Sequence, residues 1–286
     1  MTPAQFELLD VDQAATLLQA RFQALTDAGH ELIGALLLAV RPDLIVGTSV
    51  GALHGAMVAV DPTLASVDKL EAAWKELAGL GVLGRSWFDD AVSLLRTRTH
   101  VRSNVPMRRL AERLLGVRTF RELAVPFQCV AACIERFSEQ WFDSGPLVDA
   151  ILASSAVPGI LPPVEIGGEH YIDGGIVNSI PIDRAVFLGA SEVYVLHAGR
   201  IEQPLAPPRS MRDVGFVAFE IARRHRFVRD LAAVPEGVTV HVLPTGDPAA
   251  PRYNDFSQLR FRDFRRVDNR IAFAYAASAE YLDARA

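Results

Sequence analysis

One stretch decides the fold: Pro42-Asp43-Leu44-Ile45-Val46-Gly47-Thr48-Ser49-Val50-Gly51-Ala52-Leu53-His54-Gly55-Ala56-Met57-Val58-Ala59. Leu44 to Val46 form a short apolar run between a proline and a glycine, which predicts a buried strand. The residues from Ala52 to Ala59 are small or favour helices, and they predict a tightly packed helix. We therefore expect a strand, a sharp turn and a helix, in this order.

The turn between the expected strand and helix has the sequence G-x-S-x-G, which is typical of a nucleophile elbow in this setting. Such a turn strains the backbone of Ser49. Side chains two positions before and after Ser49 would collide, which explains the glycines at positions 47 and 51. The turn places Ser49 at a helix N-terminus, where free N–H groups favour negative charge. We predict Ser49 as a nucleophile and the Val50 N–H as an oxyanion donor; a glycine-rich turn without chemistry is the alternative.

Size and composition indicate one globular protein. The chain has 286 residues, of which 50% are hydrophobic and 22% are charged, enough for a sizeable core. The net charge of −5 argues against a nucleic-acid surface. We found no linker that would separate two domains. We therefore expect a single domain over residues 1–286, with an atypical helical region at 1–41 and a C-terminal helical segment at 246–286.

Helices and strands are expected to alternate along most of the chain. Helical spacing of apolar residues predicts helices at 11–40, 65–80, 107–115, 147–154, 181–188, 211–232 and 263–281. Apolar runs predict strands at 126–133, 192–197 and 238–243, and hairpins are expected at 136–142 and around Gly167-Gly168. Alternating strands and helices are typical of an α/β protein with a mostly parallel central sheet that is covered on both faces.

Several features bear on location and partners. Cys129 and Cys133 lie in an apolar segment without further evident ligands, so we interpret them as core residues and expect no metal site. The N-terminus lacks a signal-peptide pattern and no apolar run is long enough to span a bilayer, which predicts a cytoplasmic protein. The basic cluster Arg223-Arg224-His225-Arg226 is interpreted as a solvated helix face, although an anionic membrane surface would also suit it.

A serine nucleophile needs a base, and Asp173 is the candidate. It lies at the end of an expected strand, directly before Gly174 and Gly175, which give the backbone room to bring the carboxylate near another loop. Aspartate in water has a pKa of about 3.9 and is a poor base at neutral pH. Partial desolvation against the elbow would raise its proton affinity. Taken alone, Asp-Gly-Gly is also consistent with a plain turn.

Three motifs together resemble the patatin-like phospholipase family. The elbow at 47–53 resembles the family's nucleophile elbow, and Ala153-Ser154-Ser155-Ala156-Val157-Pro158-Gly159-Ile160-Leu161-Pro162-Pro163-Val164 resembles the segment before its aspartate. Tyr171-Ile172-Asp173-Gly174-Gly175-Ile176-Val177-Asn178-Ser179-Ile180-Pro181 resembles its Asp-Gly-Gly motif. The resemblance implies a three-layer α/β/α sandwich that hydrolyses lipid or other acyl esters with a Ser-Asp dyad through an acyl-enzyme, without a cofactor. Ser49 and Asp173 would form the dyad.

The sequence departs from the family pattern in one respect and leaves two alternatives open. Residues 1–41 contain no G-G-G-x-R/K-G loop, whose N–H groups form the oxyanion hole in the family. The first alternative is therefore a catalytically impaired relative that binds acyl lipid or a protein partner. The second is a Ser49-Asp173-His197 triad esterase, since His197 follows Asp173 at the end of an expected strand. Peripheral membrane contact is compatible with the sequence, and the oligomeric state is not predicted.

Overall fold

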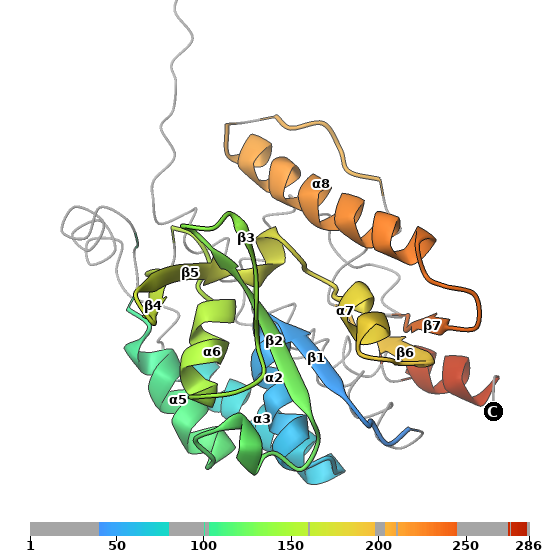
Figure 1. The fold of residues 1–286 in the computed structure, drawn as a ribbon, viewed down its shortest axis with the longest axis horizontal. Helices are drawn as coiled ribbons and strands as arrows, with labels where there is room; N and C mark the ends of the chain where they lie inside the picture. Colours follow the sequence, from blue (N-terminus) through green and yellow to red (C-terminus); the bar gives the residue numbers. More distant parts are fainter. Residues whose placement is uncertain are drawn as a thin grey trace, which may run out of the picture.

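The computed structural model describes residues 40–79, 100, 103–159, 161–197, 204–209, 211–244, 274 and 276–284 (Figure 1). Its strands are β1 (Ile45–Thr48), β2 (Phe127–Cys133), β3 (Ser138–Phe142), β4 (Val164–Ile166), β5 (Glu169–Asp173), β6 (Glu192–Val195) and β7 (Thr239–Val242). Its helices are α2 (Val50–Val60), α3 (Leu64–Gly79), α5 (Val105–Leu115), α6 (Leu147–Ser154), α7 (Ile182–Phe187) and α8 (Met211–Ala232), with single-turn helices η1 (Phe120–Glu122) and η2 (Gly174–Ile176).

The described strands form a five-stranded sheet of β1 to β5 and a separate parallel pair of β6 and β7. Helices surround the larger sheet, which is the α/β/α arrangement expected from the sequence (Figure 1). The expectation of a mostly parallel sheet is wrong for the described strands, because β1 alone pairs in parallel with β2 and the other pairings in this sheet are antiparallel. Two of the three antiparallel pairings, β2–β3 and β4–β5, are hairpins, and short turns can join only antiparallel neighbours; the third, β2–β5, joins distant segments.

Strand β2 brings two other strands end to end. Residues 129–133 of β2 pair with β3. Residues 127–130 of β2 pair with β1, and residues 131–133 of β2 pair with β5. Because a strand has two edges, and β3 overlaps both of the other partners, β1 and β5 must share the second edge. Thr48 at the end of β1 lies opposite Val130, and Asp173 at the end of β5 lies opposite Ala131. The two strands run toward one another and their C-terminal ends meet.

The main core lies between the larger sheet and its helices. It contains buried side chains of α2, β2 and α6, including Met57, Phe127 and Ile151. A second cluster joins β6, α7 and α8, and a third includes Leu243 and Leu282 near the C-terminus. Among the described residues, no helix has the length and apolar character that crossing a bilayer requires.

The domain prediction is only partly covered by the described residues. Residues 1–39, which make up nearly all of the expected helical N-terminal region, lie outside them. Residues 245–273 of the C-terminal segment also lie outside, whereas residues 276–283 are helical, as expected for the end of that segment. The single-domain assignment stays a prediction.

Candidate active site

The elbow between β1 and α2 has the strained geometry expected from its sequence. Ser49 has a φ of 56° and a ψ of −124°, a region that residues with a side chain rarely occupy. A Cβ atom at Gly47 would lie 2.4 Å from the carbonyl oxygen of Gly51, so only glycine fits there. The collision predicted for Gly51 itself is wrong, because a Cβ at that position would meet nothing within 4 Å. Gly51 lies in the first turn of α2, and it is its carbonyl that crowds Gly47.

The structure brings Ser49 and Asp173 into direct contact. The Ser49 hydroxyl donates a hydrogen bond of 2.5 Å to Oδ2 of Asp173. The other carboxylate oxygen accepts a hydrogen bond of 2.7 Å from the backbone N–H of Gly175. A Cβ at Gly174 would lie 2.2 Å from the carbonyl oxygen of Val130, and one at Gly175 would lie 2.9 Å from Oδ1 of Asp173. Both glycines are therefore needed for the carboxylate to sit against β2 and face the elbow.

Burial changes the acidity of Asp173. Its side chain is 4% exposed, and this desolvation raises its pKa from 3.8 to about 6. The hydrogen bonds from Ser49 and Gly175 and the positive charge of Arg223 act in the opposite direction. At neutral pH the carboxylate is ionised, yet it binds a proton more readily than an aspartate in water. This combination suits a general base.

Two serines at the end of α6 hold the backbone of Ser49 from both sides. The Ser49 N–H donates a hydrogen bond of 2.9 Å to the Ser154 hydroxyl, and the Ser155 hydroxyl donates one of 2.9 Å to the Ser49 carbonyl. Both serines are fully buried. The sequence showed this pair within a recognisable motif, but nothing local indicated that it would contact the elbow more than 100 residues away. The pair stabilises the strained backbone conformation of Ser49.

The first turn of α2 offers donors for a negatively charged oxygen. Val50 is the first residue of the helix, and the N–H groups of a first turn have no acceptor within their helix. Residues 1–39, which precede the elbow and belong to the segment without a glycine-rich loop motif, lie outside the described residues. Within the described residues, no group of three or more His, Cys, Asp or Glu side chains is arranged to hold a metal ion.

His197 does not lie between the serine and the carboxylate. It follows β6, in the smaller sheet, and is buried. In a Ser-His-Asp triad the imidazole separates the other two side chains. Here the 2.5 Å hydrogen bond between Ser49 and Asp173 leaves no space for a ring between them. This geometry argues against the triad alternative.

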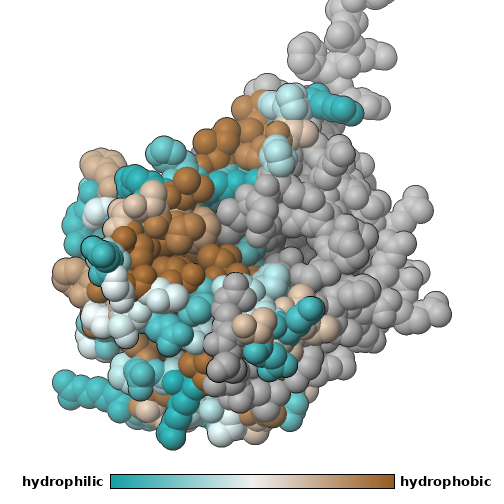
Figure 2. All heavy atoms as spheres, turned by 90° about the vertical axis from the view of Figure 1, so that its right-hand side faces the viewer, coloured by the Kyte–Doolittle hydropathy of each residue, from teal (hydrophilic) through white to brown (hydrophobic). Residues whose placement is uncertain are grey.

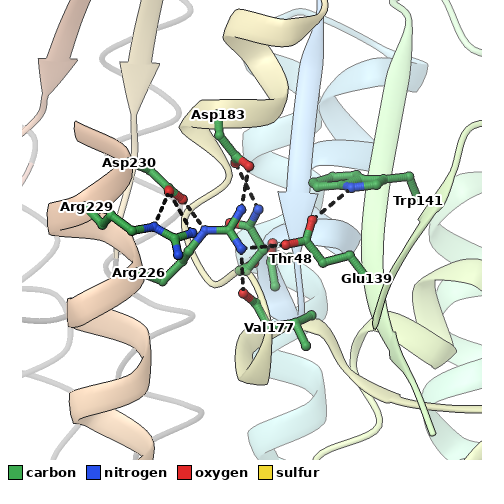
Figure 3. Close-up of polar contacts among 9 residues, drawn as sticks. Thr48, Glu139, Trp141, Val177, Asp183, Arg226, Arg229 and Asp230 are labelled. Carbon is green, nitrogen blue, oxygen red and sulfur yellow. Dashed lines mark hydrogen bonds and ion pairs between the residues drawn. The ribbon is translucent and has the colours of Figure 1, made fainter. Parts of the chain in front are cut away.

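The interpretation of the basic cluster on α8 as a solvated face is wrong for its three arginines, although His225 is exposed as expected. The side chains of Arg223, Arg224 and Arg226 are between 15% and 22% exposed, and all three form ion pairs. Figure 3 shows Arg226 reaching from α8 to Glu139 of β3 at 2.6 Å and to Asp183 of α7 at 2.5 Å. These partners are far away in the sequence, so the local pattern could not reveal them.

The Arg226 network continues to the elbow. Asp183 also accepts a hydrogen bond of 2.9 Å from the side-chain amide of Asn178, which is fully buried. The carbonyl of Asn178 in turn accepts one of 2.9 Å from the hydroxyl of Thr48, the residue before Ser49. Helix α8 is thus connected through α7 and the Asn178 loop to the end of β1. The Asn-containing turn after Asp173 has a structural role that the sequence alone did not assign.

A strained serine between a strand and a helix, hydrogen-bonded to a buried aspartate, defines an α/β protein with a nucleophile-elbow site. The chain belongs to the patatin-like phospholipase family, whose model matches residues 20–186. It is 30% identical over 163 residues to a patatin-like phospholipase domain-containing protein of Caenorhabditis elegans, a match that covers 56% of this chain and 12% of that protein.

Two further relatives match the same share of the chain. An uncharacterized NTE family protein of Mycobacterium tuberculosis is 28% identical over 163 residues, which cover 56% of this chain and 39% of that protein. Lysophospholipase nte1 of Aspergillus fumigatus is 26% identical over 160 residues, which cover 56% of this chain and 10% of that protein. The chain therefore matches well under half of the length of each of these relatives.

Proposed function

We propose that this protein is a serine hydrolase of acyl esters, with Ser49 as the nucleophile and Asp173 as the general base. The observation that carries the proposal is the 2.5 Å hydrogen bond from the strained Ser49 hydroxyl to a buried carboxylate with a raised pKa. Family membership supports the same class of reaction. The printed name of the fungal relative, lysophospholipase, favours a lipid acyl ester as substrate.

The reaction would proceed in two halves. Ser49 Oγ attacks the ester carbonyl while Asp173 takes its proton, and the Val50 N–H faces the oxygen that becomes negative. The leaving alcohol then takes the proton from Asp173, and the acyl group stays on Ser49. Asp173 next removes a proton from a water molecule that attacks the acyl-enzyme. Collapse of the second intermediate releases the carboxylic acid and returns the proton to Ser49.

A peripheral contact with a lipid surface and a cytoplasmic location are part of this proposal. Figure 2 shows hydrophobic residues gathered on the described part of one face of the molecule. Large apolar side chains are exposed on α7 and α8, among them Phe187, which is 76% exposed, and Ile221 and Val228. Exposed apolar area of this kind supports contact with lipid.

Turnover of p-nitrophenyl acyl esters and of lysophosphatidylcholine tests the proposal. Ser49→Ala removes the attacking atom, so we expect at least about a thousandfold loss of kcat. His197→Ala is expected to keep kcat within about threefold, because the dyad needs no imidazole. Undiminished hydrolysis by Ser49→Ala would refute the nucleophile. Binding of lysophosphatidylcholine by a wild-type protein without turnover would instead support the impaired-relative alternative.

A further inference from the structure

Helix α8 lies against the turn that holds Asp173. It packs on both α7 and η2. The Cζ atom of Phe219 is 3.5 Å from the position that a Cβ would take at Gly175, and the Ser179 hydroxyl is 3.9 Å from the same point. Gly175 is the residue whose N–H donates to the Asp173 carboxylate. Phe219 and Ser179 therefore lie next to the turn, close to the same point as Oδ1 of Asp173.

Arg223 connects α8 to this turn. Its Nε donates a hydrogen bond of 2.8 Å to the Ser179 hydroxyl, and the guanidinium pairs with Glu220, one helical turn earlier, at 2.9 Å. The side chain is 15% exposed, and that of Glu220 is 4% exposed. A guanidinium with its Nε and one terminal nitrogen both engaged is held in one orientation. Arg223 therefore presents a fixed positive charge beside the Asp173 turn.

We propose that Arg223 is a positioning residue for Asp173: it fixes the glycine turn through Ser179 and supplies the positive charge that favours the ionised carboxylate. This inference rests on the proposed function, in which Asp173 must be ionised to accept the serine proton. Burial raises the pKa of Asp173, and the charge of Arg223 lowers it. Arg223 thus offsets part of the effect of burial and extends the pH range over which the base is ionised toward lower pH.

The other arginines of α8 near this turn also form ion pairs, as Arg223 does with Glu220. Arg226 pairs with Glu139 of β3, Asp183 of α7 and Asp230 of α8. Arg224 pairs with the same carboxylate as Arg223, that of Glu220, at 3.3 Å. Facing Asp173 directly are the hydroxyl of Ser49, from the elbow, and the N–H of Gly175, from η2. Among the arginines of α8 that the structure describes, Arg223 is the one whose positive charge lowers the pKa of Asp173.

The test is a titration of the Asp173 carboxyl by carbon-13 NMR in the full chain, with the resonance assigned by its loss in Asp173→Asn. Arg223→Gln keeps a donor for Ser179 and removes the charge, so the Asp173 midpoint should rise by about half a pH unit. Arg223→Lys should keep the wild-type midpoint. Arg224→Gln is the matched control, because Arg224 also pairs with Glu220 and is buried to a similar extent as Arg223. This substitution should leave the Asp173 midpoint unchanged.

Kinetics give a second readout. In Arg223→Gln the rising limb of the pH profile of kcat/KM should move by the same amount. This shift gives about a threefold loss at pH 5 and little loss at pH 8. An unchanged midpoint in Arg223→Gln, or an equal rise in Arg224→Gln, would overturn the positioning role while leaving the hydrolase proposal intact. A raised midpoint in a protein that hydrolyses no ester would support the role of Arg223 and refute the proposed function.

Discussion

Asp173→Asn is expected to lose about a thousandfold or more of ester turnover while the folded protein becomes more stable at pH 8. The loss follows from the role of the carboxylate, since removing a general base costs about 10²–10⁴ in rate. Asparagine has nearly the same shape and can still accept the hydrogen bond from the Gly175 N–H, so the turn should survive. Activity and stability should therefore change in opposite directions.

The sign of the stability change follows from the pKa of Asp173. The folded-state pKa is raised, from 3.8 to about 6, so burial of the ionised form destabilises the native state above pH 6. The difference corresponds to about 3 kcal/mol at most, and Asp173→Asn removes this cost. As the pH falls through 6 toward 4, the native wild-type carboxyl becomes protonated and the advantage of asparagine disappears.

Urea unfolding of both proteins at pH 8 and at pH 4 measures this effect. We expect a higher midpoint for Asp173→Asn at pH 8 and similar midpoints at pH 4. Asp149→Asn is a suitable control, because this carboxylate is partly exposed and is not part of the elbow. It pairs with Arg108, with 2.6 Å between the nitrogen and the oxygen. Its removal should lower stability slightly and leave turnover unchanged. A destabilised Asp173→Asn at pH 8 would contradict the buried, ionised carboxylate.

Gly174→Ala is the second substitution with a large expected effect, on folding rather than on chemistry. The added Cβ would lie 2.2 Å from the carbonyl oxygen of Val130 and 2.8 Å from its carbonyl carbon, both backbone atoms of the central strand. Backbone atoms cannot rotate away as a flexible side chain can, so the turn or β2 must move. We expect a loss of about 3 kcal/mol or more in the free energy of unfolding.

Gly51→Ala is the matched control for this prediction. Gly51 belongs to the neighbouring elbow, but a Cβ there meets no atom within 4 Å, and the position lies in the first turn of α2. Since alanine favours helices more than glycine, we expect unchanged or slightly increased stability. Thermal unfolding monitored by circular dichroism compares the two variants. Equal transitions for Gly174→Ala and wild type would show that the turn does not press against β2 as described.

Local sequence signals were sufficient for much of the fold. The helix at 211–232 and the hairpin around Gly167-Gly168 were predicted where the structure has them, because helical periodicity and glycine turns act over a few residues. Ser49 and Asp173 were each predicted as site residues from a short motif of their own; the structure places them in contact, and their catalytic roles stay predictions. The meeting of β1 and β5 on one edge of β2 could not be predicted, since it depends on pairing between segments about 80 and 40 residues apart.

Contacts between distant segments also account for what sequence reasoning missed. The burial of Arg226 depends on Glu139 and Asp183, which no local pattern connects to α8. The sequence showed Ser154 and Ser155 only as part of a family motif and gave no role for their side chains. Their partner is the backbone of Ser49, which lies more than 100 residues away. We expected collisions at both glycines because they lie two residues before and two residues after Ser49. The structure leaves no room for a Cβ at Gly47, on the strand side, but leaves room for one at Gly51.

The most direct test of the Ser49–Asp173 pairing is the rate at which a fluorophosphonate labels the protein, followed by peptide mass spectrometry between pH 4.5 and pH 8.5. We expect a single adduct on Ser49, with a labelling rate that rises through a midpoint near pH 6, and strongly slowed labelling in Asp173→Asn. Labelling at another residue, or a Ser49 rate that is the same in wild type and Asp173→Asn, would contradict the pairing.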